Sequence, residues 1–174
     1  GWNDIVMKKS SDDGATWSAM HVVYSESKPG KNVCIGNPSP VQLASGEVIL
    51  VACRNNKQVI SLRSTDAGAS WGTVCDISNM VVPKSWSWVA TGPPQGLELS
   101  PGGRVLVSAD HIEGGNWGSH SMYSDDGGVS WNISASLPGG NECQAAKVNE
   151  THLLMNMRTR DSGLRQFSWS TDEG

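Results

Sequence analysis

Residues 124–131 read SDDGGVSW, and this stretch decides the fold because its pattern recurs along the chain. The template is Ser, any residue, Asp, any residue, Gly, any two residues and Trp. The Asp carboxylate can accept hydrogen bonds from backbone N–H groups of its own turn, the Gly supplies a positive φ, and the Trp covers the turn with apolar area. The pattern therefore predicts a structural hairpin turn and needs no substrate. The other copies are SSDDGATW at residues 10–17, STDAGASW at 64–71 and the partial STDEG at 170–174.

We call these four segments Asp boxes, and their spacing indicates a repeated unit. The opening serines of successive boxes lie 54, 60 and 46 residues apart. Propeller blades repeat at about 40–50 residues, so the spacing is typical of blades with some longer loops. We assign a structural role to four residues of each complete box: Ser10, Asp12, Gly14 and Trp17; Ser64, Asp66, Gly68 and Trp71; Ser124, Asp126, Gly128 and Trp131.

Strand-like runs fill the segments between the boxes. They form hairpins with short Gly, Ser, Pro and Asn turns, and each hairpin is followed by a third strand that enters a box and by a short fourth strand. No helical periodicity competes with this pattern. Repeated four-stranded antiparallel sheets favour an all-β propeller over a sandwich, because radial repetition leaves only short edges exposed. The predicted hairpins are 41–43 with 47–54, 96–99 with 104–111 and 144–148 with 152–158; the third strands are 4–9, 59–64, 119–124 and 164–170, and the fourth are 19–24 and 73–77.

The alternation of strand direction assigns the turns to two sides of the disc. The box turns join strands three and four, so they lie opposite the ends of the second strands and the starts of the first strands. Inner strands converge on the axis, and these ends would line a central pocket. They carry charged and amide residues next to apolar strands, which indicates function. The residues are Asn37, Pro38, Arg54, Asn55, Asp110, His111, Asn141, Glu142 and Arg158.

Composition excludes several classes of function. The net charge is −4 and the largest basic cluster is Lys8 and Lys9, which argues against a nucleic-acid partner. The longest apolar run, residues 48–53, is too short to span a membrane. The four cysteines lack zinc-type spacing, so we expect free thiols, no metal and no cofactor, although three disulfide connectivities remain open.

The chain starts without Met and stops inside a box, so we expect residues 1–174 to be a propeller of about three blades, incomplete at both ends.

Glu142 and Arg158 lie at opposite ends of one predicted hairpin and would face the axis on the same side. A guanidinium at such a site can bind a carboxylate or phosphate through two parallel hydrogen bonds. The alternatives are a salt-bridged strand end for Arg158 and a structural partner of an arginine for Glu142. Asp110 and His111 fit either a binding site or a loop brace. Arg160 and Arg165 are expected to be ordinary surface charges.

The chain resembles part of a sialidase (neuraminidase) of the six-bladed propeller type over essentially its whole length. The Asp boxes are shared with unrelated propellers, so other motifs carry more of the resemblance. They are NPSPV at residues 37–41, WVATGPPQG at 88–96, NECQAAKV at 141–148 and LLMNMR at 153–158. The resemblance implies a partial six-bladed propeller that acts on sialylated glycoproteins, glycolipids or oligosaccharides. It also favours a secreted, lysosomal or membrane-associated location.

The resemblance further implies roles for individual residues. Glu142 would take the proton of a Tyr nucleophile, and Arg158 would be the second of three arginines that bind the substrate carboxylate. Asn37 would lie in the sugar pocket, and Asp110 and His111 at a strand end that contacts the glycan in relatives. A phenol with a pKa near 10 needs such a base. A neutral Tyr beside Glu also avoids setting one carboxylate against another, and the reaction would be retaining hydrolysis.

Some features of the family are not found in this chain. The first Arg and the acid/base Asp are expected upstream, and the third Arg and the Tyr nucleophile after Gly174, so this chain alone should hydrolyse no sialoside. Tyr123 adjoins a box on the wrong face and Tyr24 ends an outer strand, so neither can replace the nucleophile. Gly92-Pro93-Pro94 stands where the family has Gly-Pro-Gly. Besides an exo-α-sialidase, two hypotheses stay open. One is a non-catalytic Asp-box propeller that binds glycans or proteins, and the other is a glycosidase of neutral polysaccharides with a carboxylate pair.

Overall fold

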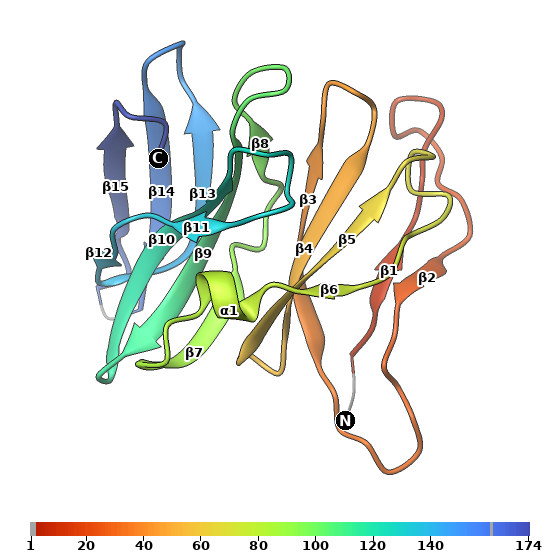
Figure 1. The fold of residues 1–174 in the computed structure, drawn as a ribbon, viewed down its shortest axis with the longest axis horizontal. Helices are drawn as coiled ribbons and strands as arrows, with labels where there is room; N and C mark the ends of the chain where they lie inside the picture. The colour runs from red at the N-terminus through yellow and green to blue at the C-terminus, as the bar shows by residue number, and fades with distance from the viewer. Residues whose placement is uncertain (1–2, 161) are drawn as a thin grey trace.

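The computed structural model describes residues 3–160 and 162–174 as four antiparallel sheets that follow one another in chain order. Figure 1 shows these sheets side by side, from β1 and β2 to β15. The first two sheets contain β1 (Ile5–Met7) and β2 (His21–Tyr24), then β3 (Ile35–Gln42), β4 (Val48–Arg54), β5 (Gln58–Ser64) and β6 (Cys75–Asp76). After α1 (Ser78–Val81), the third contains β7 (Trp86–Thr91), β8 (Leu97–Glu98), β9 (Val105–Glu113), β10 (Asn116–Ser124), β11 (Asn132–Ile133) and β12 (Leu137–Pro138). The fourth contains β13 (Gly140–Lys147), β14 (Leu153–Thr159) and β15 (Arg165–Ser170).

The all-β class and the blade pattern predicted from the sequence are confirmed. The second sheet has the order β3-β4-β5-β6, in which every strand pairs with its neighbour in sequence. Its Asp box at residues 64–71 lies between the third and fourth strands, as predicted. The sheets do not close into a ring within the described residues, so the architecture is that of a partial β-propeller.

The predicted first strands of the blades were too short. β3 begins at Ile35 and β13 at Gly140, several residues before the predicted starts at 41 and 144. Each strand shifts register near its start, between Gly36 and Ser39 and between Gly140 and Cys143. A β-bulge allows pairing to continue past residues that break the alternation of polar and apolar side chains. In the third sheet the predicted strand 96–99 is only the second of two pieces, because β7 and β8 both pair with β9.

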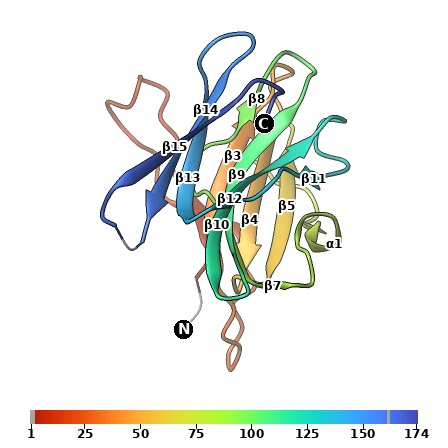
Figure 2. The same ribbon diagram turned by 90° about the vertical axis from the view of Figure 1, so that its left-hand side faces the viewer.

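Neighbouring sheets pack face to face through apolar side chains. Val51 and Val59 of the second sheet share a buried cluster with Val89, Val107 and Met122 of the third. Full burial of such a side chain contributes about 1.5–3 kcal/mol. In Figure 2 the sheet of β13, β14 and β15 lies beside β9 and β10, against which its own apolar face packs. This packing fixes one blade against the next and so positions their ends.

The Asp boxes form closed hydrogen-bonded turns. In the third box Ser124 Oγ donates to Asp126 Oδ1 at 2.8 Å and accepts from the Gly128 N–H at 2.7 Å. The N–H and hydroxyl of Ser130 both donate to the Asp126 carboxylate, at 2.9 and 2.6 Å. These bonds lie within the turn itself, in keeping with the structural role predicted for this Asp. In all three complete boxes the Trp ring lies over the box glycine, as predicted, with Cζ2 of Trp17, Trp71 and Trp131 lying 3.9, 3.6 and 3.5 Å from where a glycine Cβ would stand. Trp131 is 3% exposed, whereas Trp17 is 61% exposed because the first sheet has no neighbour on that side among the described residues.

The box carboxylates should make folding sensitive to acid. Hydrogen bonds from Ser70 and Ser64 lower the pKa of Asp66 from 3.8 to about 2. Because the folded pKa is depressed, this stabilisation is present above pH 4 and is lost as the pH falls towards 2. We expect Asp66→Asn to lower the melting temperature at pH 7 and to have little effect at pH 2. Thermal unfolding followed by circular dichroism at both pH values tests this, with Asp13→Asn, on an exposed Asp of the first box, as the control. An equal effect at both pH values would contradict the prediction.

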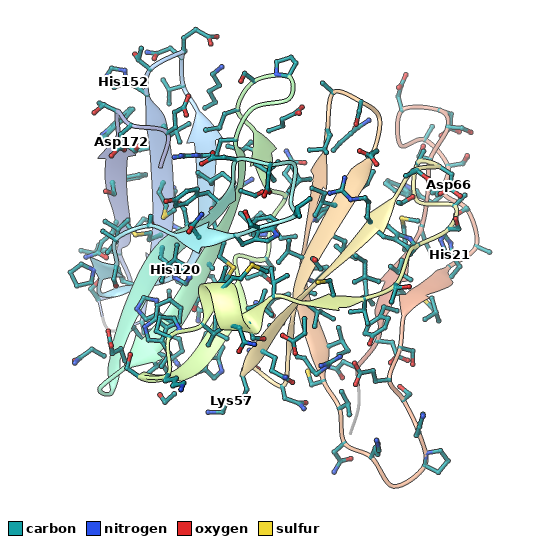
Figure 3. The ribbon with its side chains drawn as sticks, viewed as in Figure 1. His21, Lys57, Asp66, His120, His152 and Asp172 are labelled. Carbon is teal, nitrogen blue, oxygen red and sulfur yellow. The ribbon has the colours of Figure 1, made fainter. Side chains whose placement is uncertain are left out.

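The box turns and the second-strand ends lie on opposite sides, as turn parity predicted. Figure 3 labels Asp66 and Asp172, both in boxes, near the upper edge of the sheets and Lys57, in the β4–β5 turn, at the lower edge. His152, at the start of β14, also lies at the upper edge. The end of β14 that carries Arg158 is therefore at the lower edge, away from the boxes.

Candidate active site

The candidate site residues Asp110 and Arg158 occupy the same position in the second strand of their blades. Within the second strands, Val48, Val105 and Leu153 lie opposite the opening serines of three boxes. Five residues further along each strand, at the lower edge, the same position is occupied by Cys53, Asp110 and Arg158. Side chains of adjacent strand residues point to opposite faces of a sheet. The next residues, Arg54, His111 and Thr159, therefore belong to the other face.

Glu142 and Arg158 form an ion pair, the contact that the sequence analysis gave as the structural alternative for both residues. Arg158 Nη1 donates to Glu142 Oε2 at 2.8 Å, across the bulge of β13. The side chains are 51% and 45% exposed, so an ion can reach both. A guanidinium has five N–H donors, and this contact uses one of them. The remaining donors can bind a carboxylate in the bidentate geometry that arginine favours.

Asp110 lies beside this pair in a buried position. Its side chain has no exposed area, and Asn141 Nδ2 donates to its Oδ2 at 2.6 Å. Burial first and the charge of Glu142 second raise the pKa of Asp110 from 3.8 to about 7, against the opposing charge of Arg158. The structure therefore brings Asp110, Glu142 and Arg158 into one electrostatic environment.

The start of β13 is held close to the third sheet. Ser119 Oγ donates to the Asn141 carbonyl at 2.8 Å. A Cβ at position 140 would overlap the same Ser119 hydroxyl, so only glycine allows this approach. Gly140 thus allows the strand that carries Glu142 to begin in close contact with Ser119 of β10.

Asn37 occupies the bulge of β3, which corresponds to the bulge of β13. Its φ is 52°, a left-handed conformation that Asn tolerates. Asn37 Nδ2 donates to the Thr91 carbonyl at 3.0 Å, and the Thr91 hydroxyl donates to the Asn37 carbonyl. The Cys143 N–H in turn donates to the Gly92 carbonyl at 3.0 Å. Asn37 therefore connects β3 to β7 of the next blade. The Cys143–Gly92 bond makes a similar connection to β13, the strand that carries Glu142.

The structure does not bring His111 to Glu142 and Arg158. The His111 ring is buried on the other face of β9 and stacks on Trp86, with ring centroids 3.8 Å apart. Its Nδ1 lies 3.0 Å from Nδ1 of His120, which Figure 3 labels within β10. Burial lowers the pKa of His111. The ring braces the β9–β10 hairpin, one of the two readings that its sequence position allowed.

Arg54 also faces away from the site position. It forms an ion pair with Glu26 and a longer one, 3.8 Å, with Asp76. Its guanidinium also donates to the Tyr24 hydroxyl at 3.4 Å. These contacts tie β4 to the first sheet, so Arg54 is a salt-bridged strand end.

Two tryptophans that the sequence reasoning did not assign lie on the Asp110 face. Trp88 and Trp117 flank Ile112 in register, two positions beyond Asp110 on β9. Their ring centroids are 5.0 Å apart, and the Arg160 guanidinium lies 4.6 Å from the Trp117 ring centroid. Arg160 is exposed, as expected of a surface charge, but its guanidinium also packs on Trp117 and its charge lowers the pKa of Asp110. Trp88 and Ala90 are two residues apart, as are Asp110 and Ile112, so each pair lies on one face of its strand. This spacing could have indicated that a tryptophan shares a face with Asp110.

Comparison with known proteins agrees with this architecture. A family model described as a BNR repeat-like domain matches residues 1–174. The chain belongs to this BNR repeat-like family. Among curated proteins, Sialidase-4 of Mus musculus is 34% identical over 153 residues, which are 79% of this chain and 30% of that protein. A sialidase of Bacteroides fragilis is 27% identical over 98% of the chain and 36% of its own length.

A solved structure shares the same BNR-type fold. The Hadza microbial sialidase Hz136 matches 98% of this chain and 39% of its own, with a TM-score of 0.89 and 24% identity. This BNR-type chain thus spans about a third of the sialidases that it matches. Within residues 3–160 and 162–174, no group of three or more His, Cys, Asp or Glu side chains could hold a metal ion. No helix of the described part is long and apolar enough to cross a membrane.

Proposed function

We propose that the complete polypeptide containing this chain is an exo-α-sialidase that removes terminal sialic acids from glycoproteins, glycolipids or oligosaccharides. The observation that carries the proposal is the accessible Glu142–Arg158 pair, at 2.8 Å, on the propeller side opposite the Asp boxes. The similarity to sialidases over 79–98% of the chain supports it.

The chemistry of sialic acid fits this pair. The sugar carries a carboxylate beside its anomeric carbon, and Arg158 would bind that carboxylate through paired N–H donors. Glu142 would then accept the proton of a Tyr supplied by another part of the polypeptide, since an unassisted phenol is a poor nucleophile at neutral pH. Attack by the Tyr oxygen on the anomeric carbon would break the bond to the aglycone, whose oxygen would take a proton from the acid/base Asp expected elsewhere in the polypeptide. Water would then cleave the glycosyl–Tyr bond, and the two displacements together would retain configuration.

The surroundings of the pair suit a polyhydroxylated ligand. Trp88 and Trp117 offer apolar ring surface, and Asp110 and Asn37 place polar groups near the same end of the blades. Binding pockets commonly combine aromatic walls with a few placed polar groups. We therefore assign Trp88, Trp117 and Asn37 to the substrate pocket of the proposed enzyme, and we place the fully buried Asp110 behind it.

A pair of substrates tests the proposed function. The complete polypeptide is assayed with a fluorogenic α-sialoside and with the matched neutral galactoside. We expect release only from the sialoside, because the arginine site selects a carboxylate. Proton NMR of the first turnovers should show the α-anomer of the product if the reaction retains configuration. Turnover of the galactoside would favour a neutral glycosidase, and sialoside binding without turnover would favour a non-catalytic propeller.

A further inference from the structure

Asp110 is a buried carboxyl that the proposed mechanism does not use. Its Oδ2 accepts the hydrogen bond of Asn141, but its Oδ1 is buried and has no hydrogen-bond partner within the described residues. An ionised carboxylate without full pairing is costly to bury, whereas a neutral carboxyl costs much less. The position therefore favours the protonated acid, unlike the Glu142 side chain next to it.

The groups around Asp110 come from several elements. Glu142 is the only other carboxylate among the causes that shift it, and the positive charges come from Arg158 and Arg160. His111 and His120 lie on the opposite face of the third sheet, because His111 is adjacent to Asp110 in β9 and His120 is paired with Ala109. The groups facing Asp110 are Asn141, Glu142 and Cys143 of β13, Arg158 of β14, Arg160 after β14, and the uncharged Ser119 of β10 and Ala90 of β7.

We propose that Asp110 is a positioning residue whose deprotonation weakens the binding of an anionic substrate at the site. In the neutral state it holds Asn141, and hence the bulge that presents Glu142, while Arg158 remains the dominant charge facing the ligand. In the ionised state it adds a second buried negative charge beside Glu142. That charge opposes the substrate carboxylate. The inference rests on the proposed sialidase function.

The pH range follows from burial. The pKa of Asp110 is raised from 3.8 to about 7, so the carboxyl is neutral in acid and ionises as the pH passes through neutrality. The value of kcat/KM should therefore decline above about pH 7. The decline should appear mainly in KM, since the added charge repels the ground-state anion as well as the transition state.

Asp110→Asn tests the inference in the complete polypeptide. The amide keeps the size of the side chain and an oxygen that can accept the Asn141 bond, but it stays neutral. We expect the alkaline limb of kcat/KM for a sialoside to move up by about one pH unit or more. Asp13→Asn, which removes the same charge on the box side, should leave the limb in place. An unchanged limb in Asp110→Asn would overturn the inference.

A second variant guards against misfolding of the first. The Asn141 bond lowers the pKa of Asp110, so Asn141→Ala should also move the alkaline limb upwards, whatever it does to the maximal rate. A downward shift would contradict the inference.

The titration itself can be followed without turnover. Carboxyl carbon NMR of the complete polypeptide, assigned through the signal missing in Asp110→Asn, should give a midpoint near 7 for Asp110. A midpoint near 4 would overturn the inference even if the enzyme is a sialidase. A neutral midpoint in a protein that hydrolyses no sialoside would instead refute the proposed function and leave the titration of Asp110 established.

Discussion

Arg158→Ala in the complete polypeptide is expected to lower kcat/KM for a sialoside by about 100-fold or more. The variant loses the charged, bidentate contact to the substrate carboxylate. It also leaves Glu142 without the Nη1–Oε2 bond of 2.8 Å, so that two negative charges would face each other in the occupied site. Initial rates over a range of sialoside concentrations separate the expected rise in KM from the fall in kcat.

Two further variants define the cause of that loss. Arg165 lies opposite Arg158 in the β14–β15 register and is exposed, with its Nε bonded to Asn156. Arg165→Ala removes the same charge and should leave the kinetics near those of the wild type. Arg158→Lys keeps the charge but loses the planar fork, so we expect a smaller loss than with alanine. Unchanged kinetics in Arg158→Ala would remove Arg158 from the site.

The sequence predicted which side of the disc carries the site, because that prediction depends only on local patterns. The Asp boxes identify the connections between third and fourth strands, and strand alternation then assigns every other turn. Glu142 and Arg158 contact each other at this end of the blades, and their charges affect the pKa of Asp110. No long-range information was needed beyond the order of the strands.

The sequence could not decide between adjacent residues at a strand end. Asp110 and His111 were both candidates, yet they point to opposite faces of β9, and only Asp110 is affected by the charges of Glu142 and Arg158. The face of a residue depends on register, and register in these blades is set by bulges in the first strands. A bulge adds one residue where the side-chain pattern is already polar, so its position is not visible in the sequence.

The contacts between and within blades could not be predicted from the sequence either. Arg54 has the same sequence context as the other strand-end candidates, but Glu26 of the preceding loop neutralises it. Trp88 and Trp117 are 29 residues apart in sequence and meet only because β7 and β10 pair on either side of β9. Such contacts depend on tertiary neighbours, which no local pattern specifies.

Glu142→Gln should separate catalysis from binding. The amide cannot accept a proton, so we expect kcat for a sialoside to fall by about 100-fold or more while KM changes little, because general bases contribute about 10²–10⁴-fold. Arg158 would keep its charge and its position at the end of β14, and it could still bind the substrate carboxylate. Rates and KM of the complete polypeptide, measured on the same sialoside as for the Arg158 variants, test this.

The same hairpin supplies the control for Glu142→Gln. Glu150 lies in the turn at the box side, 89% exposed and paired with Lys147 at 2.8 Å. Glu150→Gln makes the identical chemical change far from the proposed pocket and should leave both constants unchanged. If Glu142→Gln raised KM and spared kcat, Glu142 would be an ion-pair partner that orients Arg158, and the proton acceptor for the Tyr would have to be another residue. Loss of kcat alone, with the Glu150 control intact, would place the proton transfer at Glu142.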